Sequence, residues 1–325
     1  IGLLVWYGGL NVISGGDVSL GTIFLFIQMS QMLFRPLRQI ADKFNSLQMG
    51  MVAAERIFEI LETHSNIEDN GTLKPSQING NICLERLGFS YIQGESTIND
   101  ISLEIKSGET IALVGATGAG KSTIINLISR FYEFDSGDIT IDGISIRKYD
   151  LKSLRNKVSV VLQDVFLFAD SLFNNITLFD SRISKDNVIE AAKNIGVHDF
   201  IESLPNGYDY NVKERGVMLS AGQRQLIAFL RAYISKPSIL VLDEATSSVD
   251  SYSEEIIQRA IDTLTKGKTS IIIAHRLATV KNADRIVVMH KGDIVEQGTH
   301  DELLKFKDGY YAKLYDVQFA EELAV

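Results

Sequence analysis

Residues 115–122, Gly-Ala-Thr-Gly-Ala-Gly-Lys-Ser, match the phosphate-binding pattern G-x-x-x-x-G-K-[ST] at every fixed position. Glycines in such a loop let the backbone approach phosphate oxygens, and the amides that begin the following helix donate hydrogen bonds to them. Lys121 is expected to reach the β- and γ-phosphates of a nucleoside triphosphate, and the Ser122 hydroxyl to ligate Mg²⁺. The apolar run 110–114 and a helix over 122–131 are the surroundings that this loop requires. The expected nucleotide-binding residues are Gly115, Ala116, Thr117, Gly118, Ala119, Gly120, Lys121, Ser122 and Thr123.

Two adjacent carboxylates, Asp243 and Glu244, follow the apolar run 239–242. Such a run predicts a buried parallel strand, and α/β proteins bind ligands at the carboxyl ends of these strands. Asp243 is expected to act on Mg²⁺ largely through a metal-bound water, and Glu244 to polarise the attacking water. Carboxylate pairs after strands are common, so this pair indicates hydrolysis only in combination with the phosphate-binding loop.

Two further polar residues end apolar runs in the same way. Gln163 follows the run 160–162, and His275 follows 271–274. A neutral imidazole at position 275 could contact the γ-phosphate and steady the Glu244 carboxylate. For the histidines elsewhere in the chain, a structural role is the better interpretation.

A second anion site is indicated by Leu-Ser-Ala-Gly-Gln at 219–223, because the helix expected over 224–228 would place Ser220 and the following amides at its N-terminus. Residues 165 to about 237 are expected to form a largely helical insertion, separate from the strand-rich core. The chain's own phosphate-binding loop needs no second phosphate site. The pattern therefore leaves open what this helix end would bind.

The order of residues 115–122, 219–223 and 240–244 resembles the ATPase domain of ABC transporters, and the opening residues resemble its exporter branch. The resemblance implies an α/β P-loop NTPase fold: a mixed sheet core, an antiparallel β subdomain and a helical subdomain, preceded by transmembrane helices. It implies ATP and Mg²⁺ as ligands. It also implies that Tyr91 stacks on adenine and that Gln163 senses the metal and the attacking water. The catalytic residues would be Glu244, His275 and Gln163, and the metal ligands Ser122, Gln163 and Asp243.

In this family the sequence that corresponds to 219–223 is called the signature sequence, and each one closes over the ATP of a partner domain. The resemblance therefore implies that the chain acts as a dimer. The residues expected to act in trans are Ser220, Ala221, Gly222, Gln223 and Asp250. Ala221 departs from the Leu-Ser-Gly-Gly-Gln of the family, and its methyl group would crowd the approach of a γ-phosphate. This departure slightly favours a heterodimer with unequal ATP sites over a homodimer that tolerates alanine.

The first 61 residues are expected to end a transmembrane domain. Apolar segments over 1–13 and 18–34 flank a turn without Lys or Arg, whereas Arg35, Arg38 and other basic residues follow the second segment, as on the cytoplasmic side of a membrane. Apolar residues then recur every three or four positions, which predicts one helix from about Leu20 to Leu61. Residues 62–80 are expected to form a linker, and 81–325 the ATPase domain.

Composition limits the remaining choices. A net charge of −9 argues against nucleic acid as a partner, and one cysteine excludes an internal disulfide. The chain begins in an apolar run without Met, as a C-terminal fragment would. We expect a multi-pass subunit of the plasma (inner) membrane, in contact with lipid, with a cytoplasmic ATPase domain and an unspecified exported substrate. Alternatives are a membrane-linked ATPase that regulates a partner, and an ABC-type ATPase acting on chromosomes or ribosomes.

Overall fold

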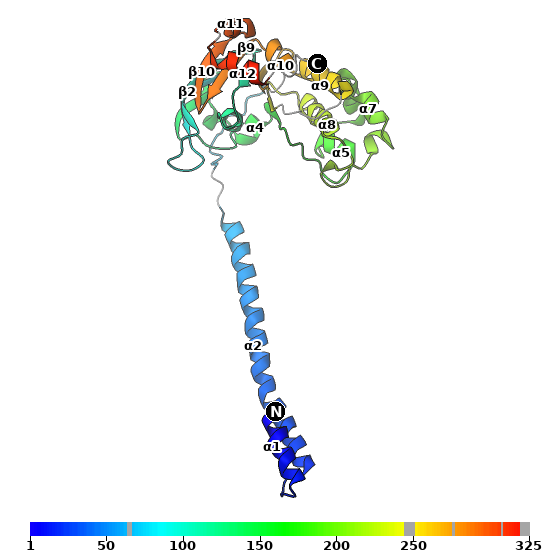
Figure 1. Ribbon diagram of the computed structural model, residues 1–325. Helices are drawn as coiled ribbons and strands as arrows, with labels where there is room; N and C mark the ends of the chain where they lie inside the picture. The colour runs from blue at the N-terminus through cyan, green and yellow to red at the C-terminus, as the bar shows by residue number, and fades with distance from the viewer. Residues whose placement is uncertain (64–66, 244–250, 275–276, 307, 319–325) are drawn as a thin grey trace. The chain divides into compact units, whose positions relative to one another are not determined.

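The computed structural model describes the chain except residues 64–66, 244–250, 275–276, 307 and 319–325, and only the backbone of 251–253. The chain divides into two compact units, Ile1–Ser65 and Asn66–Val325, and each is described by itself (Figure 1). The first unit is helical, and the second combines two β-sheets with helices. All the predicted site residues belong to the second unit.

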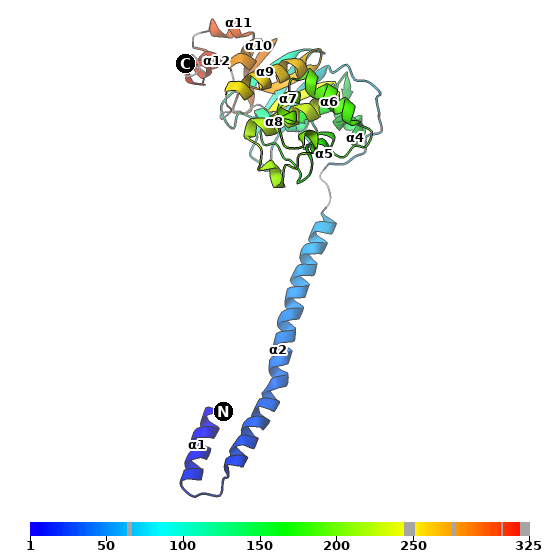
Figure 2. The same ribbon diagram turned by 90° about the vertical axis from the view of Figure 1, so that its right-hand side faces the viewer.

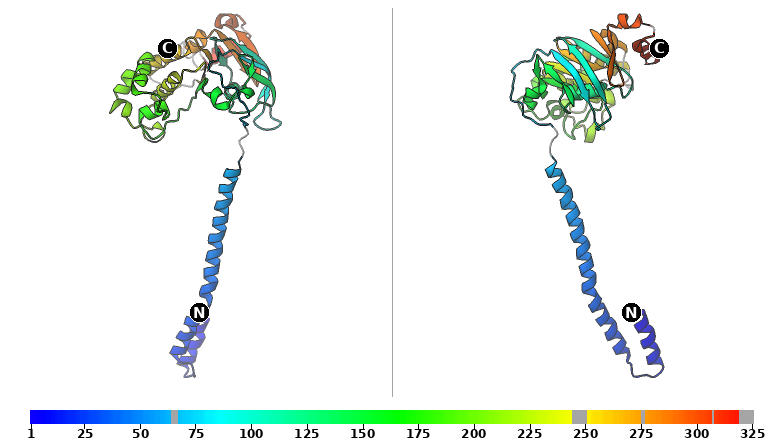
Figure 3. Two further views of the ribbon diagram at one scale, coloured as in Figure 1. Left: turned by 180° about the vertical axis from the view of Figure 1, so that it is seen from behind. Right: turned by 90° about the vertical axis from the view of Figure 1, so that its left-hand side faces the viewer.

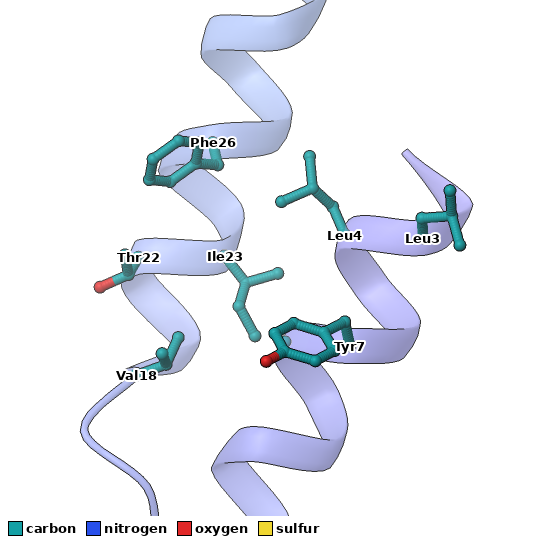
Figure 4. A pocket seen from close by; sticks show the side chains of 8 residues that line it. Leu3, Leu4, Tyr7, Val18, Thr22, Ile23 and Phe26 are labelled. Carbon is teal, nitrogen blue, oxygen red and sulfur yellow. The ribbon is translucent and has the colours of Figure 1, made fainter.

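The first unit is a hairpin of helices α1 (Gly2–Ile13) and α2 (Leu20–Glu62), which run side by side at their joined ends (Figure 2). Ser19 begins α2, because its hydroxyl accepts a hydrogen bond from the Thr22 amide at 3.1 Å. The helices meet where Ile23 of α2 points toward α1 (Figure 4), and a Cβ at Gly8 of α1 would lie 2.9 Å from the Ile23 side chain. The 43 residues of α2 correspond to about 65 Å of helix, close to the single helix that the apolar spacing predicts.

Most large apolar side chains of this unit are exposed in the chain taken alone. Within the described residues, none of the helices has both the length and the apolar character that crossing a membrane requires. The transmembrane assignment of residues 1–61 therefore stays a prediction.

A six-stranded mixed sheet forms the centre of the second unit, in the order β10-β9-β3-β8-β7-β6. Strands β9, β3, β8, β7 and β6 are parallel, and β10 pairs antiparallel with β9. The strands are β3 (Thr110–Val114), β6 (Val158–Val161), β7 (Ile239–Asp243), β8 (Thr269–Ile273), β9 (Arg285–His290) and β10 (Asp293–Gly298). The apolar runs of β3, β7, β8 and β9 are buried on both faces, as expected of parallel strands covered on both sides. The predicted α/β fold with a mixed sheet is confirmed.

A four-stranded antiparallel sheet has the order β2-β1-β4-β5. Its strands are β1 (Ile82–Phe89), β2 (Ile98–Ile105), β4 (Ser136–Ile141) and β5 (Ile144–Ser145). Alternate residues of β2 are buried, for example Ile101, Leu103 and Ile105, so one face of this sheet packs on the core.

The described helices of the second unit alternate with its strands along the chain. One follows the phosphate-binding loop, one precedes β6, several lie between β6 and β7 (Figure 3), one follows each of β7 and β8, and the last two follow β10. They are α3 (Lys121–Ile128), α4 (Leu151–Arg155), α5 (Leu172–Thr177), α6 (Lys185–Asn194), α7 (His198–Glu202), α8 (Ala221–Ile234), α9 (Ser251–Thr265), α10 (Leu277–Asn282), α11 (His300–Leu304) and α12 (Tyr310–Gln318). Short 3₁₀ turns lie at Ile146–Lys148, Gly207–Asp209 and Glu214–Gly216.

Three apolar clusters fix these elements. The first joins the antiparallel sheet and α3 to residues of β3 such as Ile111 and Leu113. The second joins α5–α9 to Leu240 and Leu242 of β7, so the helical region between β6 and β7 shares a core with the main sheet. The third packs Ala112 of β3 against α10–α12. Because β3 contributes to the first and third clusters, its end is held firmly where the phosphate-binding loop begins.

Candidate functional site

The phosphate-binding loop connects β3 to α3, as the sequence predicts. Gly120 precedes the helix in a left-handed conformation, with φ of +101°, where a Cβ would also lie 2.8 Å from the Ile98 side chain. Gly118 has φ of +81°. Glycine is the residue that adopts such conformations without strain, so both positions depend on it. Ala116, Thr117, Gly118 and Ser122 are exposed, whereas Gly115, Ala119 and Gly120 are buried.

Lys121 folds back into this loop. Its Nζ donates hydrogen bonds to the carbonyl oxygens of Gly115 and Ala116 at 2.7 and 3.0 Å. The side chain is buried, and desolvation lowers the pKa of Lys121, while the negative charge of Asp243 acts in the opposite direction. The ammonium group therefore lies at the loop and within electrostatic reach of the carboxylate that ends β7.

An aromatic cluster stands beside α3. The Tyr91 ring packs edge-on against Phe89 and Tyr132, with centroid distances of 4.8 and 5.0 Å. Its hydroxyl donates to Thr123 Oγ1 at 3.4 Å and accepts from Asn126 Nδ2 at 3.2 Å, and the side chain remains about half exposed. Tyr91 and Thr123, predicted separately, are thus in contact. The ring keeps an accessible surface for stacking.

The predicted catalytic and metal residues follow neighbouring parallel strands. Asp243 is the last residue of β7 and pairs in register with Ile273 of β8, which lies next to β3. Gln163 lies two residues beyond the end of β6 and is exposed. Parallel strands end at one edge, so the loop, Asp243 and Gln163 share that edge of the sheet. Glu244, Asp250 and His275, which were also predicted from the sequence, lie outside the described residues.

The signature residues begin helix α8. Ser220 is its N-cap: the Ser220 hydroxyl accepts from the Gln223 amide at 3.2 Å, and the Gln223 side chain accepts from the Ser220 amide at 2.9 Å. Ser220 and Ala221 are exposed, and Gly222 is buried. The helix end that the sequence predicts is therefore present, and its two outermost residues face solvent in the single chain.

Residues 98–247 match the family model described as "ABC transporter". The chain belongs to the ABC transporter family. It is 43% identical over 319 residues to the Bacillus subtilis "Uncharacterized ABC transporter ATP-binding protein YknV", with 98% of this chain and 52% of that protein covered. It is 39% identical over 323 residues to the "Probable multidrug resistance ABC transporter ATP-binding/permease protein YheH" of the same organism, covering 99% and 48%.

A solved structure titled as a bacterial Atm1-family ABC exporter with ATP bound is 34% identical to this ABC transporter chain, with a TM-score of 0.76. The similarity covers 98% of this chain and 55% of that one. The chain thus spans about half the length of the relatives that it matches.

The oxygen donors at the sheet edge of this ABC transporter chain fit Mg²⁺. Ser122 supplies a hydroxyl, Asp243 a carboxylate and Gln163 an amide oxygen, and hard oxygen donors suit this ion. In the part of the chain that the structure describes, no three His, Cys, Asp or Glu side chains cluster as a metal cage. In nucleotide sites, Mg²⁺ is held by few protein ligands together with phosphates and waters.

Three neighbours of the site are missing from the sequence-based prediction. Phe89 and Tyr132 orient the Tyr91 ring, and Asn126 binds its hydroxyl. Asn126 stands three positions after Thr123, on the same side of α3. That spacing is a signal that could have identified Asn126, once Thr123 was expected to face the nucleotide.

Proposed function

We propose that this chain is the ATP-hydrolysing part of an ABC exporter subunit, which couples ATP-driven pairing of two ATPase domains to substrate export. The observation that carries the proposal is the shared sheet edge. There the glycine loop with its buried Lys121 follows β3, Asp243 ends β7 and Gln163 follows β6. This arrangement supports a nucleoside triphosphate whose phosphates meet the loop and whose metal meets Asp243.

In the proposed reaction, a water attacks the γ-phosphorus of ATP, and the bond from that phosphorus to the β–γ bridging oxygen breaks, releasing ADP and phosphate. Lys121 and the amides that begin α3 neutralise the phosphate oxygens. Bound Mg²⁺, held by Ser122, Asp243 and Gln163, would stabilise charge on the β- and γ-phosphates. Glu244 takes the role of polarising the water, and His275 that of contacting the γ-phosphate. Tyr91 stacks on adenine.

This assignment is tested by phosphate release from the full-length parent protein, reconstituted in lipid vesicles. Glu244→Gln should reduce turnover by about 100-fold or more, because the attacking water loses its base. ATP should still bind. Glu190→Gln, an exposed carboxylate on α6, is the matched control and should leave turnover unchanged. Unchanged turnover in Glu244→Gln would reject the assignment of Glu244.

We further propose that two such domains pair head to tail, with Ser220, Ala221, Gly222, Gln223 and Asp250 acting on the partner's ATP. The exposure of Ser220 and Ala221 at the start of α8 supports contact with another chain. ATP should therefore convert the Glu244→Gln protein to a dimer in size-exclusion chromatography, either alone or together with its co-purified partner subunit. Persistence of the monomer at saturating ATP under both conditions would contradict the pairing.

The partner is proposed to be a different subunit, although a homodimer is the close alternative. Ala221 is the first residue of α8 and is exposed, so its methyl group is not crowded by other atoms of this chain. Any cost of that methyl group falls on a partner's γ-phosphate. Purification of a tagged subunit from its native cells should yield a second, different chain. A single chain with full ATPase activity would reject the heterodimer.

Residues 1–61 are proposed to end the transmembrane domain of a multi-pass protein in the plasma (inner) membrane, with the ATPase domain in the cytoplasm. Support comes from the exposed apolar side chains of α1 and α2 and from the basic residues that follow Phe34. The parent protein should stay in the membrane pellet after alkaline carbonate treatment. Its full release would reject this assignment.

A further inference from the structure

Residues 67–80, which the sequence assigns to a linker, lie along the ATPase unit and are called the strap below. The amides of Thr72 and Leu73 both donate to the Lys148 carbonyl oxygen at 3.1 Å. The Asp150 amide donates in return to the Leu73 carbonyl oxygen at 2.9 Å. Backbone bonds in both directions make this part of the strap an extension of the folded unit.

The end of the strap is fixed as well. The Asp142 carboxylate accepts hydrogen bonds from the amides of Asn79, Gly80 and Asn81, at 2.7, 3.1 and 3.0 Å. Ile78 is 4% exposed and belongs to the core between the two sheets. The strap therefore enters β1 from an anchored position.

The beginning of the strap lies directly against the backbone of the ATPase unit. The Leu151 amide donates to the Asp69 carboxylate at 3.0 Å. At Gly71, a Cβ would collide with the backbone carbonyl of Tyr149. Any larger residue at position 71 must push the strap away from Tyr149, so this contact depends on glycine.

A buried arginine joins this part of the strap to the helix of the phosphate-binding loop. Arg130 follows the end of α3 and is 3% exposed. Its Nη2 donates to the Glu68 carbonyl oxygen at 2.8 Å, and its Nε to the Glu133 carboxylate at 2.7 Å. Glu133 is also bound by Arg147 at 2.9 Å. One guanidinium thus connects the strap, the end of α3 and the segment that follows it.

Stability alone does not account for this arginine. Its Nη1 is buried without a hydrogen-bond partner among the described residues. A buried charge that is incompletely paired is costly, and an apolar side chain of similar size would fill the space at lower cost. What the guanidinium adds is a directional connection between two segments.

The geometry places the two ends of α3 in different roles. Lys121 begins the helix at the phosphate-binding loop, and Arg130 follows its last turn. The helix has only 8 residues, or about 12 Å, and one face of it is packed in the core. A shift of the loop that moves α3 must therefore also move Arg130 or break its bond to Glu68.

We propose that the strap responds to the nucleotide at the phosphate-binding loop, with Arg130 as the positioning residue that carries the response through α3. The strap continues along the chain toward α2, so it is the segment through which the chain joins the ATPase domain to the N-terminal unit. This proposal rests on the proposed function, since it requires nucleotide at the loop.

The test is hydrogen–deuterium exchange of the 325-residue chain in detergent, with and without the non-hydrolysable analogue AMP-PNP and Mg²⁺. The reporters are the amides that join strap and domain: Thr72, Leu73, Asp150 and Leu151. AMP-PNP should slow their exchange by about fivefold or more, the lower end of typical coupling between sites. Binding of AMP-PNP is measured on the same samples by calorimetry.

Arg130→Met is the decisive variant, because Glu133 keeps Arg147 as a partner and no carboxylate is left unpaired. AMP-PNP should still bind, with its affinity reduced by the factor that coupling to the strap contributes in the unaltered chain. Its slowing of exchange at the four amides should disappear. Arg86→Met is the matched control: Arg86 is an exposed arginine, and its left-handed φ of +48° is close to the +51° of Arg130. If Arg130→Met does not fold, Gly71→Ala tests the same coupling from the strap.

The outcomes separate the two proposals. Failure of AMP-PNP to bind the unaltered chain contradicts the proposed function and removes the basis of the coupling. Binding without slower exchange at the strap overturns the coupling and leaves the ATPase proposal intact. Equal slowing in the unaltered chain and in Arg130→Met overturns the route through Arg130. Where Gly71→Ala replaces that variant, equal slowing overturns the dependence of the coupling on the strap's contact with Tyr149. Loss of the effect in the variant together with its retention in Arg86→Met supports the coupling.

Discussion

Helices α3 and α8 both present an N-terminus where a phosphate is expected, yet they begin in different ways. Gly120 caps α3 in a left-handed conformation, without a side-chain hydrogen bond. Ser220 caps α8 with its hydroxyl, and Gln223 completes the capping box. The N-terminus of α3 leaves its amide donors available to a ligand, whereas the capping box of α8 satisfies part of the amide donors at its own N-terminus.

This difference indicates that the two ends have different tasks. The start of α3 also holds a buried ammonium group, that of Lys121, which attracts negative charge. The start of α8 is partly satisfied by its own capping box and exposes Ser220 and Ala221. We infer that the loop at α3 carries most of the affinity for ATP, and that α8 adds contacts only when a partner brings a nucleotide to it.

The largest effect is expected from a substitution at the N-terminus of α3. Lys121→Met should weaken binding of AMP-PNP by about 100-fold or more, because hydrogen bonds to charged groups contribute about 1.5–3 kcal/mol each and this lysine would make at least two. Binding is measured by calorimetry. Lys152→Met, an exposed lysine on α4, is the control that should bind normally. Equal affinity in both variants would contradict the role of Lys121.

The lowered pKa of Lys121 predicts that nucleotide binding at the N-terminus of α3 weakens at alkaline pH. As pH rises through a pKa below the ordinary lysine value of about 10.4, the ammonium loses its proton and its attraction for phosphate. The affinity for AMP-PNP should begin to fall at a lower pH than it would with a lysine of ordinary pKa. Above that pH the affinity should fall by up to about tenfold per pH unit. Lys121→Arg, which stays protonated, should bind without this decline. Parallel curves for the two proteins would count against the lysine as the titrating group.

A smaller effect is expected when the second end is altered. Ser220→Ala removes the cap of α8 and should lower the free energy of unfolding by about 1 kcal/mol, as measured by urea denaturation. Binding of AMP-PNP to the chain's own loop should not change, whereas ATP-dependent dimerisation should decrease. Ser184→Ala is the matched control, since Ser184 caps α6 by accepting from the Asn187 amide at 3.3 Å. It should cost similar stability and leave dimerisation intact.

The site elements could be predicted because their signals are local. The pattern at 115–122 is contiguous, and the apolar runs before Asp243 and Gln163 predict strands whose ends meet at one edge. The capping box was also present as Ser-x-x-Gln at 220–223, but Gln223 was assigned to the partner's nucleotide. A residue can serve both purposes, and local patterns do not rank them.

The strap could not be predicted, since its partners are distant in sequence. Asp69 binds the amide of Leu151, and Glu68 binds Arg130, across 82 and 62 positions. A polar stretch with Gly71 is typical of a linker when only neighbours are considered. Only the fold brings the Tyr149 carbonyl against Gly71 and turns that glycine into a contact.

The smallest effect is expected from a substitution of Ala221, which distinguishes its contribution to the stability of α8 from its contribution to pairing with a partner. In Ala221→Gly, α8 loses a methyl group from its first turn, where alanine is the better helix former by up to about 1 kcal/mol, so the chain should become slightly less stable. If the methyl group crowds a partner's γ-phosphate, the same change should strengthen ATP-dependent pairing in the Glu244→Gln background. Denaturation and size-exclusion chromatography measure the two effects separately. Opposite signs support a role for Ala221 in setting the strength of the partner's site; weakening of both stability and pairing would mean that alanine serves the helix alone.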